Sequence, residues 1–103
     1  MRLRIDTTDN RKTVISLGGE TLVKEYKSPQ EQDVLAAIDE LLGREGKKLA
    51  DVTAIEVNRG PGAFTSLRVG ISVANALKYA LGLGKPVEPK YGQPPKITVS
   101  GLR

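Results

Sequence analysis

The stretch that decides the fold is AIEVNRGPGAFTSLRVG, residues 54–70. It begins within alternating polar and apolar residues, and we expect a half-buried strand over residues 51–58. A glycine-proline turn at residues 59–62 follows, and helical apolar periodicity then continues from residue 63 or 64 to Leu81. A strand, a tight glycine loop and a long helix in succession are typical of an α/β protein.

The residues before this stretch predict an antiparallel meander. Residues 2–6 alternate between polar and apolar side chains, and residues 13–17 are rich in β-branched ones. Gly18-Gly19 suits a hairpin turn, because glycine reaches positive φ without steric cost. Residues 21–26 then supply a third strand.

Two helices and two further strands complete the expected order. Ser28-Pro29 predicts a helix start, with the serine as N-cap, and this helix should end near residues 42–44. Residues 85–87 predict a short fifth strand, and residues 96–99 suit one more strand at an edge. The order β-β-β-α-β-α-β predicts a mixed sheet with helices mainly on one face. We assign residues 1–87 to one α/β domain and residues 88–103 to a basic tail containing Pro and Gly.

Composition excludes several classes of site. The 103 residues contain no cysteine and no histidine, which excludes disulfides, the usual zinc ligands, a cysteine nucleophile and a histidine-based triad. No apolar run approaches the length of a membrane span, and charged residues interrupt the N-terminus where a signal peptide would be apolar. We therefore expect a cytoplasmic protein.

Charge is divided unevenly along the chain. Residues 1–58 hold nine Lys and Arg against eleven Asp and Glu, whereas residues 59–103 hold seven against Glu88 alone. The basic half favours an acidic partner or RNA phosphate, although a merely soluble basic surface explains it equally well. With one Phe, three Tyr and no Trp, a reader of single-stranded RNA that stacks bases on aromatic rings is not expected.

The glycine loop is a candidate anion site. Arg59, Gly60, Gly62 and Thr65 lie where a strand meets a helix N-terminus, which offers unpaired N–H groups and a partial positive charge. The spacing matches neither a P-loop nor a dinucleotide fingerprint. A tight turn followed by a capped helix is the alternative.

The two helices carry wide apolar faces. These faces span roughly 160° on the first helix and roughly 220° on the second, whereas covering one sheet needs a stripe of about 100°. The surplus predicts either a protein–protein interface or additional internal core. The residues that we assign to an interface are Val34, Ala37, Ile38, Leu41, Leu67, Gly70, Ile71, Ala74, Leu77 and Lys78.

A polar sheet face is expected opposite the helices. In the simplest register it would carry Arg4, Asp6, Ser16, Lys24, Glu56 and Asn58. The face is either solvated or an active site. A two-metal nuclease would require several converging carboxylates, of which this face offers Asp6 and Glu56.

The residues from Asn58 to Gly70, together with a first strand ending in Asp6-Thr7-Thr8, resemble the TsaB (YeaZ-like) family over about residues 1–87. The resemblance implies an RNase H-like, actin/Hsp70-type fold and a catalytically silent partner in tRNA threonylcarbamoyladenosine synthesis. It implies that the helices at 30–44 and 64–81 pack against the catalytic subunit TsaD, joined by the ATPase TsaE. TsaD modifies adenosine 37, so the tRNA is contacted indirectly. ATP or ADP and metal belong to that complex, and we expect no cofactor on this chain alone.

The chain departs from the family pattern at several places. Ala63 and Ser66 replace the usual Ser and Gly, no histidine precedes the first helix, and the 103 residues span only the part that resembles the family's N-terminal half. The helices could therefore pair two copies of this chain. Two further alternatives are a homo-oligomeric binding module of another pathway and a stand-alone nucleotide-binding enzyme of the actin-like superfamily.

Overall fold

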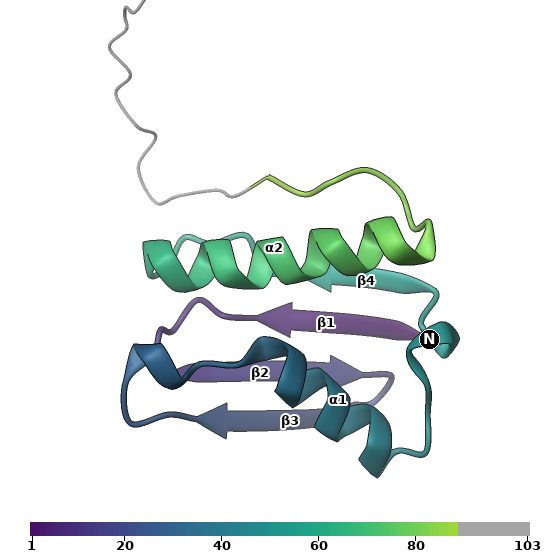
Figure 1. Cartoon of the computed structure of the whole chain (residues 1–103), viewed down its shortest axis with the longest axis horizontal. Helices are drawn as coiled ribbons and strands as arrows, with labels where there is room; N and C mark the ends of the chain where they lie inside the picture. The colour runs from purple at the N-terminus through teal and green to yellow at the C-terminus, as the bar shows by residue number, and fades with distance from the viewer. Residues whose placement is uncertain (89–103) are drawn as a thin grey trace, which may run out of the picture.

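A four-stranded mixed sheet carries two helices on one of its faces (Figure 1). The computed structural model describes residues 1–88. Its elements are β1 (Arg2–Asp6), β2 (Lys12–Leu17), β3 (Glu20–Glu25), α1 (Val34–Arg44), β4 (Ala54–Val57) and α2 (Phe64–Leu81), with short 3₁₀ turns η1 (Pro29–Glu31) and η2 (Leu49–Asp51). The sheet order is β3-β2-β1-β4, with β1 and β4 parallel and the other pairs antiparallel. The expected mixed α/β fold is confirmed.

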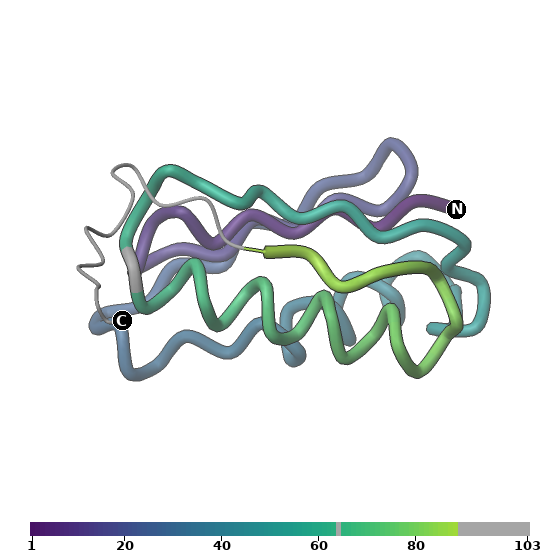
Figure 2. The backbone as a smooth tube through the Cα atoms, turned by 90° about the horizontal axis from the view of Figure 1, so that it is seen from above, coloured from purple at the N-terminus to yellow at the C-terminus, as the bar shows by residue number. Residues whose placement is uncertain are grey.

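The core lies between the sheet and the helices. Leu3 pairs with Leu17 and Ile5 with Ile15 across β1 and β2, and all four side chains are buried. Because residues opposite each other in a ladder share a face, they form one apolar layer. Helix α1 covers β2 and β3, and α2 covers β1 and β4, as Figures 1 and 2 show. The prediction that this face of β1 and β2 points to the helices is confirmed.

The first helix begins later than predicted. Ser28 precedes only η1 and makes no side-chain capping bond, whereas Asp33 is the N-cap of α1 and accepts a hydrogen bond from the Ala36 N–H at 3.0 Å. Gln32 separates the two elements with an extended backbone, and its side-chain amide donates to the Lys12 carbonyl at 3.3 Å. This contact with β2 holds the chain out of helical geometry, so the start predicted at Ser28-Pro29 was wrong.

Lys24 lies on the opposite face from the one predicted. Its partner in the β2–β3 ladder is the buried Thr13, and its ammonium forms an ion pair with Glu40 of α1 at 3.1 Å. Lys24 therefore faces the helices, while its neighbour Val23 faces away from them and is 48% exposed. The Gly18-Gly19 turn sets the register between β2 and β3. The predicted face for Lys24 differs from this register by one residue, and a difference of one residue exchanges the two faces of a strand.

The chain after α2 does not form the expected fifth strand. Helix α2 ends at Gly82, which adopts the left-handed conformation with φ 68°. Residues 85–87 are not paired with β4, and the Asn75 side chain instead binds both backbone groups of Val87, at 2.7 and 2.9 Å. The predicted strand at 96–99 lies outside the described residues, and the division at residue 87 remains a prediction.

Candidate partner groove and glycine loop

The side chains that we assigned to a partner interface lie inside the molecule. Nine of the ten residues, all except the half-buried Lys78, are buried in the structure. Ala74, Leu41 and Leu67 are 0% exposed. Gly70 packs so closely on β1 that an added Cβ would lie 3.0 Å from Thr7 Cγ2. The alternative weighed for the surplus apolar width, internal core, therefore describes these side chains.

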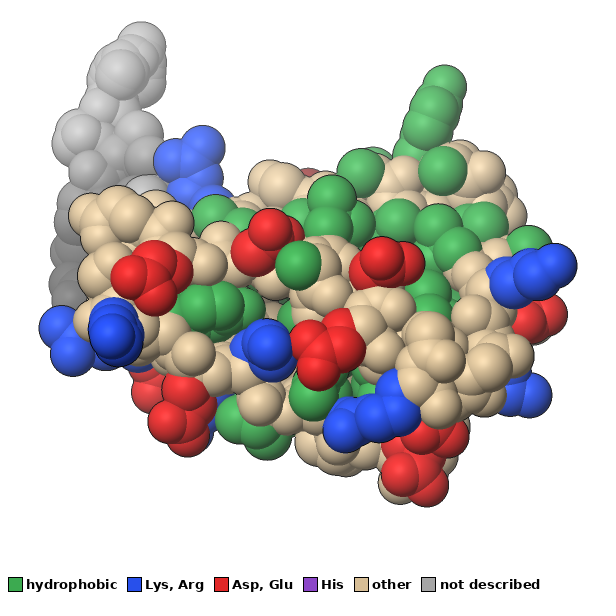
Figure 3. Space-filling model, turned by 60° about the horizontal axis from the view of Figure 1, so that its bottom comes forward, with side chains coloured by type: hydrophobic (Ala, Val, Ile, Leu, Met, Phe, Trp, Pro, Cys, Tyr) green, Lys and Arg blue, Asp and Glu red, His purple; other side chains and the backbone are tan. Residues whose placement is uncertain are grey.

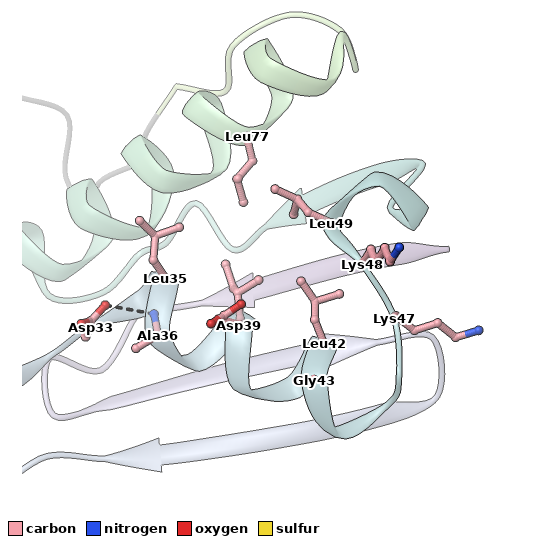
Figure 4. Close-up of a pocket in the computed structure, with 11 residues that line it drawn as sticks. Asp33, Leu35, Ala36, Asp39, Leu42, Gly43, Lys47, Lys48, Leu49 and Leu77 are labelled. Atoms are coloured by element: carbon pink, nitrogen blue, oxygen red, sulfur yellow. Dashed lines mark hydrogen bonds between the residues drawn. The ribbon is translucent and has the colours of Figure 1, made fainter.

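An apolar groove nevertheless remains between the two helices. It has a volume of about 820 Å³. Apolar side chains from α1, α2 and the loop between α1 and β4 line it: Leu35, Ala36, Ile38, Leu42, Leu49 and Leu77. In Figure 4, Leu77 extends from α2 toward α1, Leu49 extends toward the same space, and Lys47 points away from it. The helices thus cover the sheet without closing completely on each other.

The rim of the groove mixes charge with exposed apolar surface. Asp33 and Asp39 lie on the α1 side, and Lys47 and Lys48 lie in the loop that follows α1. Leu35, which lines the groove, is 55% exposed, and Val69 of α2, which does not line it, is 37% exposed. Figure 3, which views the molecule obliquely from the β3 edge, shows apolar side chains interspersed with acidic and basic ones.

The interface residues assigned from the sequence did not include two exposed apolar residues of the helices, Leu35 and Val69. Leu35 and Val69 belong to the apolar arcs of the two helices, but they lie toward the margins of those arcs. The centre of an arc packs on the sheet, so the residues left for a second molecule are the marginal ones. The usable signal was the angular position of each apolar residue within its arc.

The glycine loop is shaped by packing against the end of β1. The Gly60–Pro61 peptide is cis, and the Gly60 N–H donates to the Asn58 side-chain oxygen at 3.0 Å. The Ala63 N–H donates to the Thr8 carbonyl at 2.9 Å. A Cβ on Gly62 would lie 2.7 Å from Thr8 Cβ, so glycine is required there by close approach. Two loop N–H groups therefore have partners within the chain, while Arg59 and Thr65 remain exposed.

A reciprocal pair of buried hydrogen bonds joins β1 to α2. The Thr7 hydroxyl donates to the Ser66 carbonyl at 2.7 Å, and the Ser66 hydroxyl donates to the Thr7 carbonyl at 2.6 Å. Thr7 and Ser66 are 0% and 2% exposed. Buried polar groups without partners are costly, so this pair fixes the distance between the strand and the helix.

Asp6 organises the end of β1. Partial burial by itself raises the pKa of this carboxyl, but hydrogen bonds from Thr8 and Asn58, with the nearby Arg4, outweigh it and lower the pKa below its usual value. The Thr8 N–H and hydroxyl donate to one oxygen at 3.0 and 2.7 Å, and the Asn58 amide donates to the other at 3.2 Å. Asp6 is thus an ionised structural acceptor.

The second carboxylate of the polar sheet face is bound by arginines. Glu56 contacts Arg2 at 3.7 Å and Arg4 at 3.6 Å, so its charge is compensated on the open face. Among residues 1–88, no group of three or more acidic, His or Cys side chains is arranged to hold a metal ion. In the same part of the chain, neither helix combines the length and apolar character that crossing a bilayer requires.

Comparison with known proteins relates this chain to proteins of tRNA threonylcarbamoyladenosine synthesis. A family model described as TsaD, tRNA N6-adenosine threonylcarbamoyltransferase, matches residues 25–88. The tRNA threonylcarbamoyladenosine biosynthesis protein TsaB of Haemophilus influenzae is 37% identical over 84% of this chain and 37% of its own length. TsaB of Escherichia coli is 39% identical over 54% of this chain and 23% of its own. The tRNA N6-adenosine threonylcarbamoyltransferase of Ralstonia pickettii is 49% identical over 48% of this chain and 14% of its own.

The fold is similar to that of solved relatives as well. YeaZ from Pseudomonas aeruginosa superimposes with a TM-score of 0.66 at 32% identity, covering 79% of this chain and 39% of that one. This similarity confirms the expected RNase H-like, actin-type architecture and the resemblance to TsaB and YeaZ proteins. The chain spans less than half the length of each of these relatives.

Proposed function

The chain belongs to the TsaD family, and we propose that it is a TsaB-like, non-catalytic subunit of tRNA threonylcarbamoyladenosine synthesis that binds a TsaD-type subunit. The observation that carries this proposal is the apolar groove between α1 and α2, which Leu35 lines with more than half of its surface exposed. Exposed apolar surface with a charged rim is typical of a protein-binding surface.

The groove has the chemistry of an interface core. Fully burying a leucine side chain contributes about 1.5–3 kcal/mol, so covering the exposed half of Leu35 would contribute about 1 kcal/mol. The rim carries both signs of charge, Asp39 on α1 and Lys47 and Lys48 beyond it. Such a rim sets the orientation of a partner and adds less to affinity.

In this proposal the chain acts in the cytoplasm and supplies contacts, and the partner supplies the chemistry. Its binding would favour an active arrangement of the TsaD-type subunit through differential contact with that state. A TsaE-type ATPase, ATP or ADP, and a metal ion belong to the larger assembly, and this chain alone holds none of them. The tRNA is brought to the complex by the TsaD-type subunit.

A second copy of this chain is the alternative occupant of the groove. The same exposed residues, Leu35 and Val69, would then pair α1 and α2 of two copies. A homodimer and a TsaD complex would compete for one surface, because both would bury the same side chains.

The test is light scattering after size exclusion, with the chain alone and mixed with the TsaD-type subunit of the same source. We expect a complex that Leu35→Glu weakens by at least about tenfold, because a charge replaces buried apolar surface. Val23→Glu is the matched control, since Val23 has a similar exposure, 48%, on the face away from the helices.

The results separate the alternatives. Wild type that forms neither a mixed complex nor a dimer contradicts the proposal. Self-association that Leu35→Glu abolishes, without any mixed complex, favours the homodimer. Equal weakening by the two variants would show that the groove is not the contact surface.

A further inference from the structure

A second hollow follows the outer edge of β4. It has a volume of about 470 Å³ and lies between β4, the last turns of α2 and residues 85–88. Figure 2 shows the segment after α2 returning along the helix on the side of β4. We call this space, lined by Ile55, Glu56, Val57, Arg59, Lys78 and residues 85–88, the β4 hollow.

The Asn75 side chain keeps the β4 hollow open. It donates to the Val87 carbonyl at 2.9 Å and accepts from the Val87 N–H at 2.7 Å. This pair of bonds gives Val87 the partners that a neighbouring strand would otherwise supply. The segment bearing Lys85 is therefore fixed beside α2 and not paired with β4.

Positive charge collects around the β4 hollow. Arg59, Lys78 and Lys85 line it, with Glu56 and Glu88 as the acidic members. Arg2 and Arg4 approach Glu56 from β1 and compensate its charge. Within residues 1–88, ion pairs join Arg2 and Arg4 to Glu56, and Lys24 to Glu40. Arg59, Lys78 and Lys85 therefore have no carboxylate of this part of the chain within ion-pairing distance.

We propose that the β4 hollow binds the phosphate backbone of RNA. Its cations lie on separate elements along one strand edge, which suits a chain of phosphates better than a single carboxylate. The chain has no Trp and few other aromatic residues, so contact would be made to phosphates and not by stacking on bases. The choice of RNA over another polyanion rests on the proposed role in tRNA modification, where direct contact by this chain goes beyond delivery of tRNA by the partner.

The expected signature is dependence on salt. Each phosphate contact contributes about −0.7 to −0.9 to the slope of log affinity against log salt concentration. Losing Arg59, Lys78 and Lys85 should therefore make the slope shallower by about two to three. Contacts of this kind carry no sequence preference, so unrelated tRNAs should bind equally well.

The test is fluorescence anisotropy of a labelled, unmodified tRNA transcript titrated with the full chain at NaCl concentrations from about 50 to 200 mM. We expect saturable binding by wild type, and a loss of at least about tenfold at low salt in Arg59→Gln/Lys78→Gln/Lys85→Gln. The matched control, Arg11→Gln/Lys27→Gln/Arg44→Gln, removes the same charge from three exposed positions outside the β4 hollow. All variants keep residues 89–103, so the charge of that segment is constant.

A double variant that keeps Lys78 shows whether a folding defect of the triple variant causes its loss of binding. Lys78 is half-buried, whereas Arg59 and Lys85 are exposed, so Arg59→Gln/Lys85→Gln should keep the circular dichroism spectrum of wild type. Its salt slope should be shallower by about one and a half to two. Equal loss in the hollow and control variants, or no binding of tRNA by wild type, would overturn the proposal.

The experiment also separates this inference from the proposed function. Leu35→Glu should lose the TsaD-type subunit and keep tRNA, and the β4 hollow variants should do the reverse. Wild type that binds the subunit but not tRNA overturns only the RNA surface. Wild type that binds tRNA but not the subunit overturns only the proposed role.

Discussion

Substituting Gly70 tests how closely α2 approaches β1. A Cβ at this position would meet the Thr7 hydroxyl and would lie 3.0 Å from Thr7 Cγ2. The Thr7 hydroxyl cannot move without weakening its bond to the Ser66 carbonyl, 2.7 Å away in the buried interior. Gly70→Ala therefore forces either a shift of the whole helix or loss of a buried hydrogen bond.

The magnitude follows from opposing effects. Overpacking a core costs about 1–3 kcal/mol, and leaving a buried polar group unpaired costs about 1–3 kcal/mol. Replacing glycine by alanine within a helix raises the free energy of unfolding by about 1 kcal/mol through helix propensity, which offsets part of this cost. Since one of these two costs applies, the net expectation for Gly70→Ala is a loss of about 1 kcal/mol in the free energy of unfolding.

Gly43 provides the matched control. It lies in α1, and a Cβ there would have nothing within 4 Å. Gly43→Ala should raise the free energy of unfolding by about 0.5–1 kcal/mol, because only the propensity effect operates. The measurement is urea unfolding followed by circular dichroism, comparing midpoints at constant slope. Stabilisation of the protein by Gly70→Ala, to the extent found for Gly43→Ala, would refute the close contact between α2 and Thr7.

Two further substitutions test local features. Asp33→Ala removes the N-cap of α1 and should lower the free energy of unfolding, measured in urea, by about 1 kcal/mol. Ser28→Ala removes no capping bond and should lower it by less than about 0.5 kcal/mol. Equal losses would contradict the helix start at Val34. Hydrogen bonding lowers the pKa of folded Asp6, so the ionised carboxylate should stabilise wild type relative to Asp6→Asn. This difference in the free energy of unfolding should be largest above the ordinary pKa of 3.8, and it should decline as pH falls through the lowered pKa. A difference in stability that is independent of pH across this range would show that the ionised carboxylate contributes nothing.

The burial of the assigned interface residues changes what a mutation can report. A bulky charged side chain at Gly70 or Ala74 would enter the packed layer between α2 and the sheet. Such variants should unfold the chain, so a lost complex would say nothing about the contact surface. Leu35 is the informative position, because it is more than half exposed while belonging to the same helical pair.

Local sequence determined the elements and the buried faces. Alternation in β1 and β2 placed Leu3, Ile5 and Ile15 toward the helices, because successive strand side chains point to opposite faces. Helix α2 followed from its periodicity and its end from Gly82, since both signals act within a few residues. The strand–loop–helix stretch around Gly60, together with the end of the first strand, also indicated the family.

Tertiary contacts decided the rest. The face occupied by Lys24 depends on the register across a turn, the start of α1 on the Gln32 contact with β2, and the missing fifth strand on the Asn75 side chain. Which apolar helix residues are interior and which remain exposed depends on how far apart the helices lie on the sheet. These features arise from contacts between distant parts of the chain, and periodicity within one segment carries no information about such distances.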